Sequence, residues 1–131
     1  MLSGTRALLA ILACATVASG CADVPPSKEA ESRLRSTPEG AFKLFRVSIR
    51  NRWMGPAYRT LSDADRNAID ELDFVAASED RRLRRALTLP LHRIRRTAHG
   101  AEKAAGDARL EMVSEGGEWR LHIGPFLETQ E

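Results

Sequence analysis

The fold is decided most clearly by residues 109–123, which read RLEMVSEGGEWRLHI. Apolar and polar side chains alternate on both sides of Gly116-Gly117, as they do in two antiparallel strands that bury one face. A turn of Glu115 and the two glycines suits a tight connection, since glycine tolerates the positive φ angles of such turns. The stretch therefore predicts a β-hairpin. One face of its first strand carries Leu110, Met112 and Ser114, and one face of the returning strand carries Trp119, Leu121 and Ile123.

Upstream of the hairpin, the sequence predicts helices. Thr37 can cap a helix that starts at Pro38, because proline suits the first helical position. The helix is expected to continue through Arg52, with an inner face formed at three- and four-residue steps by Phe42, Phe45, Ile49 and Trp53. Gly55-Pro56 interrupts the chain before a short helical turn at 57–61.

Further elements are predicted between residues 62 and 106. Ser62 is expected to cap a helix whose buried side includes Ile69, Leu72 and Val75. A short helix at 79–87, a strand at 91–97 and a loop at 99–106 follow. Because helices come first and antiparallel strands last, we predict an α+β fold in which N-terminal helices pack on a small antiparallel sheet.

The N-terminal segment has the pattern of a lipoprotein signal peptide. Arg6 precedes an uncharged run at 7–18, which as a helix reaches only about 18 Å and is too short for a bilayer core of about 30 Å. Ser19-Gly20-Cys21 then resembles the lipobox of bacterial lipoproteins, although Ala18 stands where leucine is usual. That resemblance implies cleavage after Gly20 and a diacylglyceryl group with further acylation on Cys21.

Two alternatives exist for this segment. Ordinary secretion with cleavage after Ala15 or Gly20 would leave a soluble periplasmic protein. Cys14 is a second lipobox-like position, but its use would leave only 7–13 as the apolar run. Cys21 is favoured on length. With Ala22 after it, the resemblance to lipoproteins implies the outer membrane more than the inner one.

These patterns divide the chain into four parts. Residues 1–20 are predicted as signal peptide, 21–35 as a lipidated N-terminus and polar linker, 36–127 as a single α+β domain, and 128–131 as a frayed tail. The linker contains Pro25-Pro26 and few large apolar residues, which is typical of a tether.

Composition limits the function further. The formal net charge is only +2, and export would separate the protein from nucleic acid, so no nucleic-acid partner is expected. The two cysteines, Cys14 and Cys21, both lie near the N-terminus, so the domain has no internal disulfide or cysteine metal site.

The order of elements resembles the cone-shaped α+β fold shared by nuclear transport factor, ketosteroid isomerase and polyketide cyclases. The resemblance rests on TPEGAF at 37–42, AYRTLS at 57–62 and GEWRL at 117–121, and it covers most of 36–126. It implies helices that line a curved sheet of at least four strands. It also implies a domain that in many relatives binds a ligand or partner without catalysis.

No catalytic or metal-binding constellation is predicted. His92, His99 and His122 are separated and lack the spacing of a metal pair. Asp63-x-Asp65-x-Asn67 opens like a calcium loop, but Ala68 occupies the position that needs glycine. We therefore expect no metal, no cofactor and no enzyme activity, with a small cone-fold isomerase or cyclase-like enzyme as a lesser alternative.

The charge is unevenly distributed along the chain. An acidic block at 63–80 is followed by a segment without acids that carries Arg81, Arg82, Arg84, Arg85, Arg93, Arg95 and Arg96. These arginines form a candidate basic surface for anionic envelope components, since each basic residue near an anionic surface contributes about 1 kcal/mol. The alternative is that they pair with the acidic block or are solvated.

Aromatic residues supply a second candidate site. Aromatic side chains at helical spacing can form a core or line the wall of a ligand pocket. The candidates are Phe42, Phe45, Trp53, Tyr58 and Trp119. Together these features predict a lipid-anchored envelope protein that binds a protein partner or a small apolar ligand. The alternative is a structural protein attached to anionic surfaces through the basic segment at 81–96.

Overall fold

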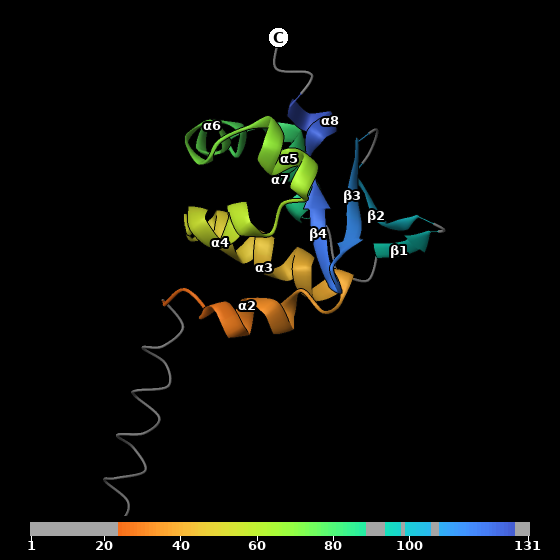
Figure 1. Ribbon diagram of the computed structural model, residues 1–131. Helices are drawn as coiled ribbons and strands as arrows, with labels where there is room; N and C mark the ends of the chain where they lie inside the picture. Colours follow the sequence, from red (N-terminus) through yellow and green to blue (C-terminus); the bar gives the residue numbers. More distant parts are fainter. Residues whose placement is uncertain (1–23, 89–93, 98, 106–107, 128–131) are drawn as a thin grey trace, which may run out of the picture.

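The computed structural model describes residues 24–88, 94–97, 99–105 and 108–127, and it has helices packed on one side of a small sheet (Figure 1). In chain order the elements are α2 (Lys28–Leu34), α3 (Pro38–Arg50), α4 (Met54–Arg59), α5 (Asp63–Ala68), α6 (Glu71–Ala77), α7 (Arg81–Thr88), β1 (Ile94–Thr97), β2 (Gly100–Ala105), β3 (Ala108–Glu115), β4 (Glu118–His122) and α8 (Gly124–Leu127). The predicted α+β class with a small antiparallel sheet is confirmed.

The sheet is antiparallel throughout and its strands follow one another in the order β1-β2-β3-β4. The predicted hairpin is confirmed, with Met112 opposite Leu121 in β3 and β4. Gly116 and Gly117 have φ angles of 59° and 83°, and two successive positive φ angles are what a two-residue hairpin turn requires. The two glycines therefore allow the tight turn that joins β3 to β4.

The first long predicted helix is confirmed from Pro38 onwards, but it ends at Arg50, before the predicted end at Arg52, and Trp53 lies outside it. Thr37 caps α3, with its hydroxyl oxygen accepting from the backbone N–H of Gly40 at 3.0 Å, and Pro38 is the first helical residue. The core lies between α3 and α7 on one side and the sheet on the other. Its buried side chains include Phe42, Phe45, Ile49, Phe74, Leu83, Leu87, Leu110, Met112, Leu121 and Ile123.

The prediction that residues 21–35 form a linker is wrong for the second half of this range, which is helical. Ser27 caps α2, which runs from Lys28 to Leu34 and packs against α3, so the folded domain begins at Lys28 and not at residue 36. Glu31 and Arg35, which a tether would expose, are 1% and 6% exposed. Ion pairs hold this helix against the domain. Its sequence has no apolar stripe, which is the pattern by which amphipathic helices are usually recognised in a sequence.

Two further predictions are corrected. The helix capped by Ser62 ends at Ala68, and Asp70 caps a new helix, α6, that turns Phe74 inward and leaves Leu72 81% exposed. Ile69 is only partly buried and Val75 is exposed, so the predicted buried side is wrong for Leu72 and Val75.

The segment predicted as a loop at 99–106 is strand β2 from Gly100 to Ala105, which pairs with both β1 and β3. The predicted strand at 91–97 corresponds to β1 at Ile94–Thr97. The signal segment, Cys14, Gly20, Cys21, His92 and Arg93 lie outside the described residues. Within the described part, no helix combines the length and apolar character needed to cross a bilayer.

Candidate functional site

Three of the five candidate aromatic residues belong to the core. Phe42 and Phe45 are fully buried, and the ring of Phe74 lies 6.1 Å from Phe45 and 5.8 Å from Tyr58. The hydroxyl of Tyr58 is within hydrogen-bond distance of two backbone carbonyl oxygens, at 2.8 Å from Ile69 and 3.0 Å from Arg66. Tyr58 thus fastens α4 to the end of α5 and is not presented to a ligand.

Trp53 and Trp119 line two different pockets that share no residue. Trp119 is partly buried in β4, and the guanidinium of Arg96 lies 5.7 Å from its ring centroid. Trp53 follows α3 and lines an apolar groove of about 220 Å³ between α3 and the segment that enters α2. The groove is lined by Val24, Pro26, Leu34, Lys43, Leu44, Val47 and Trp53. The five aromatic residues therefore do not form one pocket.

The predicted basic surface is divided between two elements. Arg81, Arg82, Arg84 and Arg85 lie on α7, and Arg95 and Arg96 lie on β1. Several are paired: Arg84 Nη2 lies 2.9 Å from Glu79, Arg82 Nε lies 3.8 Å from Asp80, and Arg95 bonds Glu102. Arg81 and Arg85 have no ion pair within the described part of the chain. The arginines are thus partly neutralised by the acidic block and partly free.

A second basic site was not predicted from the sequence. Arg46, Arg50 and Arg52 from α3 and its C-terminal turn line a pocket of about 280 Å³ together with Arg84 of α7. Nothing in the sequence brings these three residues next to Arg84, which is 32 or more positions further along. Only the packing of α3 against α7 creates this site.

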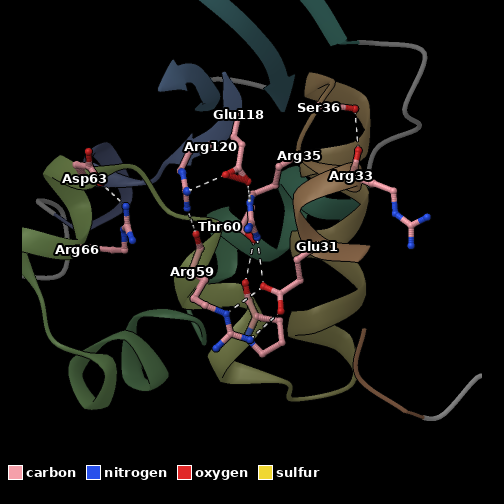
Figure 2. A network of polar contacts seen from close by, with 11 residues as sticks. Glu31, Arg33, Arg35, Ser36, Arg59, Thr60, Asp63, Arg66, Glu118 and Arg120 are labelled. Carbon is pink, nitrogen blue, oxygen red and sulfur yellow. Dashed lines mark hydrogen bonds and ion pairs between the residues drawn. The ribbon is translucent and has the colours of Figure 1, made fainter. Parts of the chain in front are cut away.

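A network of ion pairs joins α2 to the rest of the domain (Figure 2). Glu31 accepts hydrogen bonds from Arg59 at 2.8 and 3.0 Å and from Arg35 at 3.2 Å. Arg35 also donates to Glu118 at 2.8 Å, and the backbone N–H of Trp119 donates to the Arg35 carbonyl oxygen at 2.6 Å. Residues from three elements thus meet around the end of α2.

The charges of this network shift its pKa values. Burial alone would raise the pKa of Glu31, but hydrogen bonds and charges from Arg59 and Arg35 outweigh burial and hold that pKa below its usual value. The hydrogen bond from Arg35 lowers the pKa of Glu118. Burial and the neighbouring Arg35 and Arg66 lower the pKa of Arg120. The network is a stabilising structure, with every carboxylate in it paired.

His122 contacts the two residues most suggestive of catalysis. Its Nδ1 lies 3.0 Å from Asp65 Oδ1 and 3.4 Å from Ser62 Oγ. In a Ser-His-Asp triad the serine and the aspartate contact opposite ring nitrogens, whereas here both contact the same one. Asp65 also accepts from the Ile123 N–H at 2.6 Å, so the group joins α5 to the end of β4.

The described residues contain no cluster of three or more histidine, cysteine and acidic side chains that could hold a metal ion. Lys103 of β2 is a buried residue that the loop prediction missed, with its Nζ 3.9 Å from the ring centroid of Phe42.

Comparison with models of protein families, with curated proteins and with solved structures gives no match. The cone-shaped family resemblance stays a prediction from the sequence.

Proposed function

We propose that this protein is a lipid-anchored cell-envelope protein, attached through Cys21, whose domain binds a small apolar ligand without catalysing a reaction. The observation that carries the proposal is the apolar groove beside α3. Val24 forms part of its wall, and Val24 is three residues after Cys21. Three residues span at most about 11 Å, so an anchor on Cys21 would hold the groove close to the membrane surface.

An acyl chain is the ligand that fits this position best. Leu44, Val47 and Trp53 supply apolar surface, and Lys43 is the single charged residue of the lining. A tryptophan at a membrane surface is favourable, because its ring is apolar and its N–H can stay hydrated. Lipidated Cys21 would bring acyl chains within reach of the groove. Ala22 after Cys21 supports the outer membrane as the location.

The non-catalytic part of the proposal rests on two arrangements. The Asp65, His122 and Ser62 contacts are those of a structural link, because the serine has no separate ring nitrogen to act as its base. The helical side of the sheet is covered by the apolar core, which includes the fully buried Phe42 and Phe45. The cone-shaped fold itself remains part of the proposal, supported by the order of helices and strands.

A second candidate function is attachment to anionic envelope surfaces through the basic segment at 81–96. Arg81 and Arg85 favour it, since both are exposed on α7 and have no ion pair in the described part of the chain. Charge reversal at Arg84, Arg85, Arg93 and Arg95 tests this candidate. Unchanged binding to anionic vesicles would exclude it.

The anchor is tested by the mass of the N-terminal peptide of protein extracted from membranes, beside a Cys21→Ala control. We expect a peptide that starts at Cys21 and is heavier by a diacylglyceryl and an acyl group, and we expect the control to lack this mass. An unmodified peptide from the soluble fraction would exclude the anchor and leave the soluble periplasmic alternative.

The groove is tested by tryptophan fluorescence of the lipidated protein in vesicles whose acyl chains carry bromine. The Trp119→Phe variant leaves Trp53 as the single tryptophan, and Trp53→Phe is the matched control that leaves Trp119. Bromine quenches only nearby rings, so we expect strong quenching of Trp53 and little of Trp119. Equal quenching of the two would exclude acyl-chain binding in the groove even if Cys21 is lipidated.

A further inference from the structure

Four arginines line one pocket between α3 and α7. Arg46 and Arg50 lie one helical turn apart on α3, Arg52 follows its C-terminal cap, and Arg84 comes from α7. The remaining lining is Ile49, Leu87 and Thr88. The helices α3 and α7 are in contact. The pocket is therefore a basic cavity with an apolar floor.

Within the part of the chain that the structure describes, three of these arginines have no carboxylate partner. Among the described residues, no acidic side chain forms an ion pair with Arg46, Arg50 or Arg52. The buried Nε of Arg46 has no hydrogen-bond partner in this part of the chain, and its guanidinium lies 5.5 Å from the ring centroid of Phe42. A buried donor without a partner is uncommon and calls for an explanation.

Arg52 has an unusual backbone conformation. The helix α3 ends in a Schellman motif, with hydrogen bonds from Trp53 N–H to Ser48 oxygen at 2.8 Å and from Arg52 N–H to Ile49 oxygen at 3.2 Å. The residue that must adopt the left-handed conformation there is usually glycine, yet here it is Arg52, with φ at 59°. Because this conformation costs energy for a residue with a Cβ atom, its presence beside the pocket favours a role for the Arg52 side chain there.

The charge balance at the pocket favours an anion. Glu79, which holds Arg84 in place at 2.9 Å, contributes one negative charge. The C-terminal ends of α3 and α7 contribute about half a negative charge each. Four arginines therefore leave about two positive charges in excess, and none of the pocket's own lining residues is acidic.

We propose that this pocket binds the phosphate group of a phosphate ester. Arginine forks match the oxygen atoms of phosphate in geometry and charge, and several can bond one group at once. Ile49 and Leu87 provide an apolar floor for the organic part of the ester. The pocket is separate from the apolar groove, and its binding does not depend on acylation of Cys21. The ester is either a lipid headgroup or a soluble molecule.

The test measures binding to the full chain in nonionic detergent micelles by titration calorimetry. One arm adds inorganic phosphate, and the other adds the same micelles containing phosphatidic acid, with phosphatidylcholine micelles as reference. Binding of inorganic phosphate points to a soluble ester, whereas binding of phosphatidic acid micelles alone points to a lipid headgroup. Either result supports the site if the variants below respond as expected.

The variants are Arg50→Gln and Arg52→Gly, compared with Arg33→Gln as a control of equal charge change. Arg33 is exposed on α2 and does not line the pocket. We expect each pocket variant to weaken binding roughly tenfold or more, because each loses a charge-assisted hydrogen bond. Arg33→Gln should leave the affinity nearly unchanged. Absence of binding in both arms, or equal losses in all three variants, would overturn the proposal.

Discussion

Glu31 and Arg59 form an ion pair 2.8 Å long between α2 and α4, at positions 28 residues apart in the chain. Glu31 is 1% exposed, and Arg35 contacts the same carboxylate. A buried charge is tolerated only when partners compensate its loss of hydration. The attachment of α2 therefore depends on a polar network and not on an apolar face.

Replacing Glu31 by glutamine should destabilise the fold strongly. The change leaves the buried Arg35 without one of its two carboxylates, and breaking a buried ion pair from one side costs about 3 kcal/mol or more. The free energy of unfolding from urea titration measures the loss. Glu29→Gln is the matched control, because Glu29 is exposed on the same helix. Equal effects of the two substitutions would contradict the importance of the network.

Stability should fall in acid because of Glu31 and Glu118. Both have a folded-state pKa below the ordinary value of 4.5, so their contribution is complete above that pH and is lost as the pH falls through the lowered values. Urea midpoints measured from pH 7 downwards should decline below about pH 4.5. The double variant Glu31→Gln with Glu118→Gln should be less stable at pH 7 and show a flatter decline. An unchanged decline would assign the acid sensitivity to other groups.

The parts of the fold that were predicted correctly carry periodic apolar patterns. The hairpin follows from the alternation of apolar and polar residues around Gly116-Gly117, and α3 follows from its cap at Thr37 and an aromatic inner face. Such patterns can be recognised from a short stretch of sequence. Burial of one face of a helix or strand makes apolar residues recur with the period of that element.

The parts that were missed depend on distant contacts. The sequence of α2 has no apolar stripe that would mark it as a helix. Its position depends instead on Glu31 and Arg35, which are buried against partners in α4 and β4. Strand β2 consists of small and charged residues with low strand preference, and it is held between β1 and β3. The arginine pocket was missed for the same reason, because Arg84 meets α3 only in the folded chain.

Gly40→Ala should destabilise the protein, whereas Gly55→Ala should not. In most helices alanine is more stable than glycine by about 1 kcal/mol. At Gly40, however, an added Cβ would lie 2.0 Å from the Leu34 carbonyl oxygen, so α2 would have to move away from α3. We expect a loss of about 1–3 kcal/mol, as for overpacked sites. At Gly55 the nearest atom is the flexible end of Arg59, at 3.2 Å, so that variant should be neutral or slightly more stable.

The comparison of these two variants uses the urea midpoint and the helix signal in circular dichroism. Loss of α2 docking in Gly40→Ala would appear as lower stability with a smaller helix signal, whereas Gly55→Ala should retain both. A stabilised Gly40→Ala variant would show that α2 does not approach α3 as closely as described.

Arg52→Gly should make the protein more stable. Glycine adopts the left-handed conformation without the steric cost of a Cβ atom, which is about 1–2 kcal/mol for other residues. Arg52→Ala separates the backbone from the side chain, because it removes the guanidinium but keeps the Cβ at φ 59°. We therefore expect a gain of about 1 kcal/mol for glycine and none for alanine, measured as free energies of unfolding. A gain for alanine equal to that for glycine would show that repulsion among the arginines, and not the backbone, is what destabilises this turn.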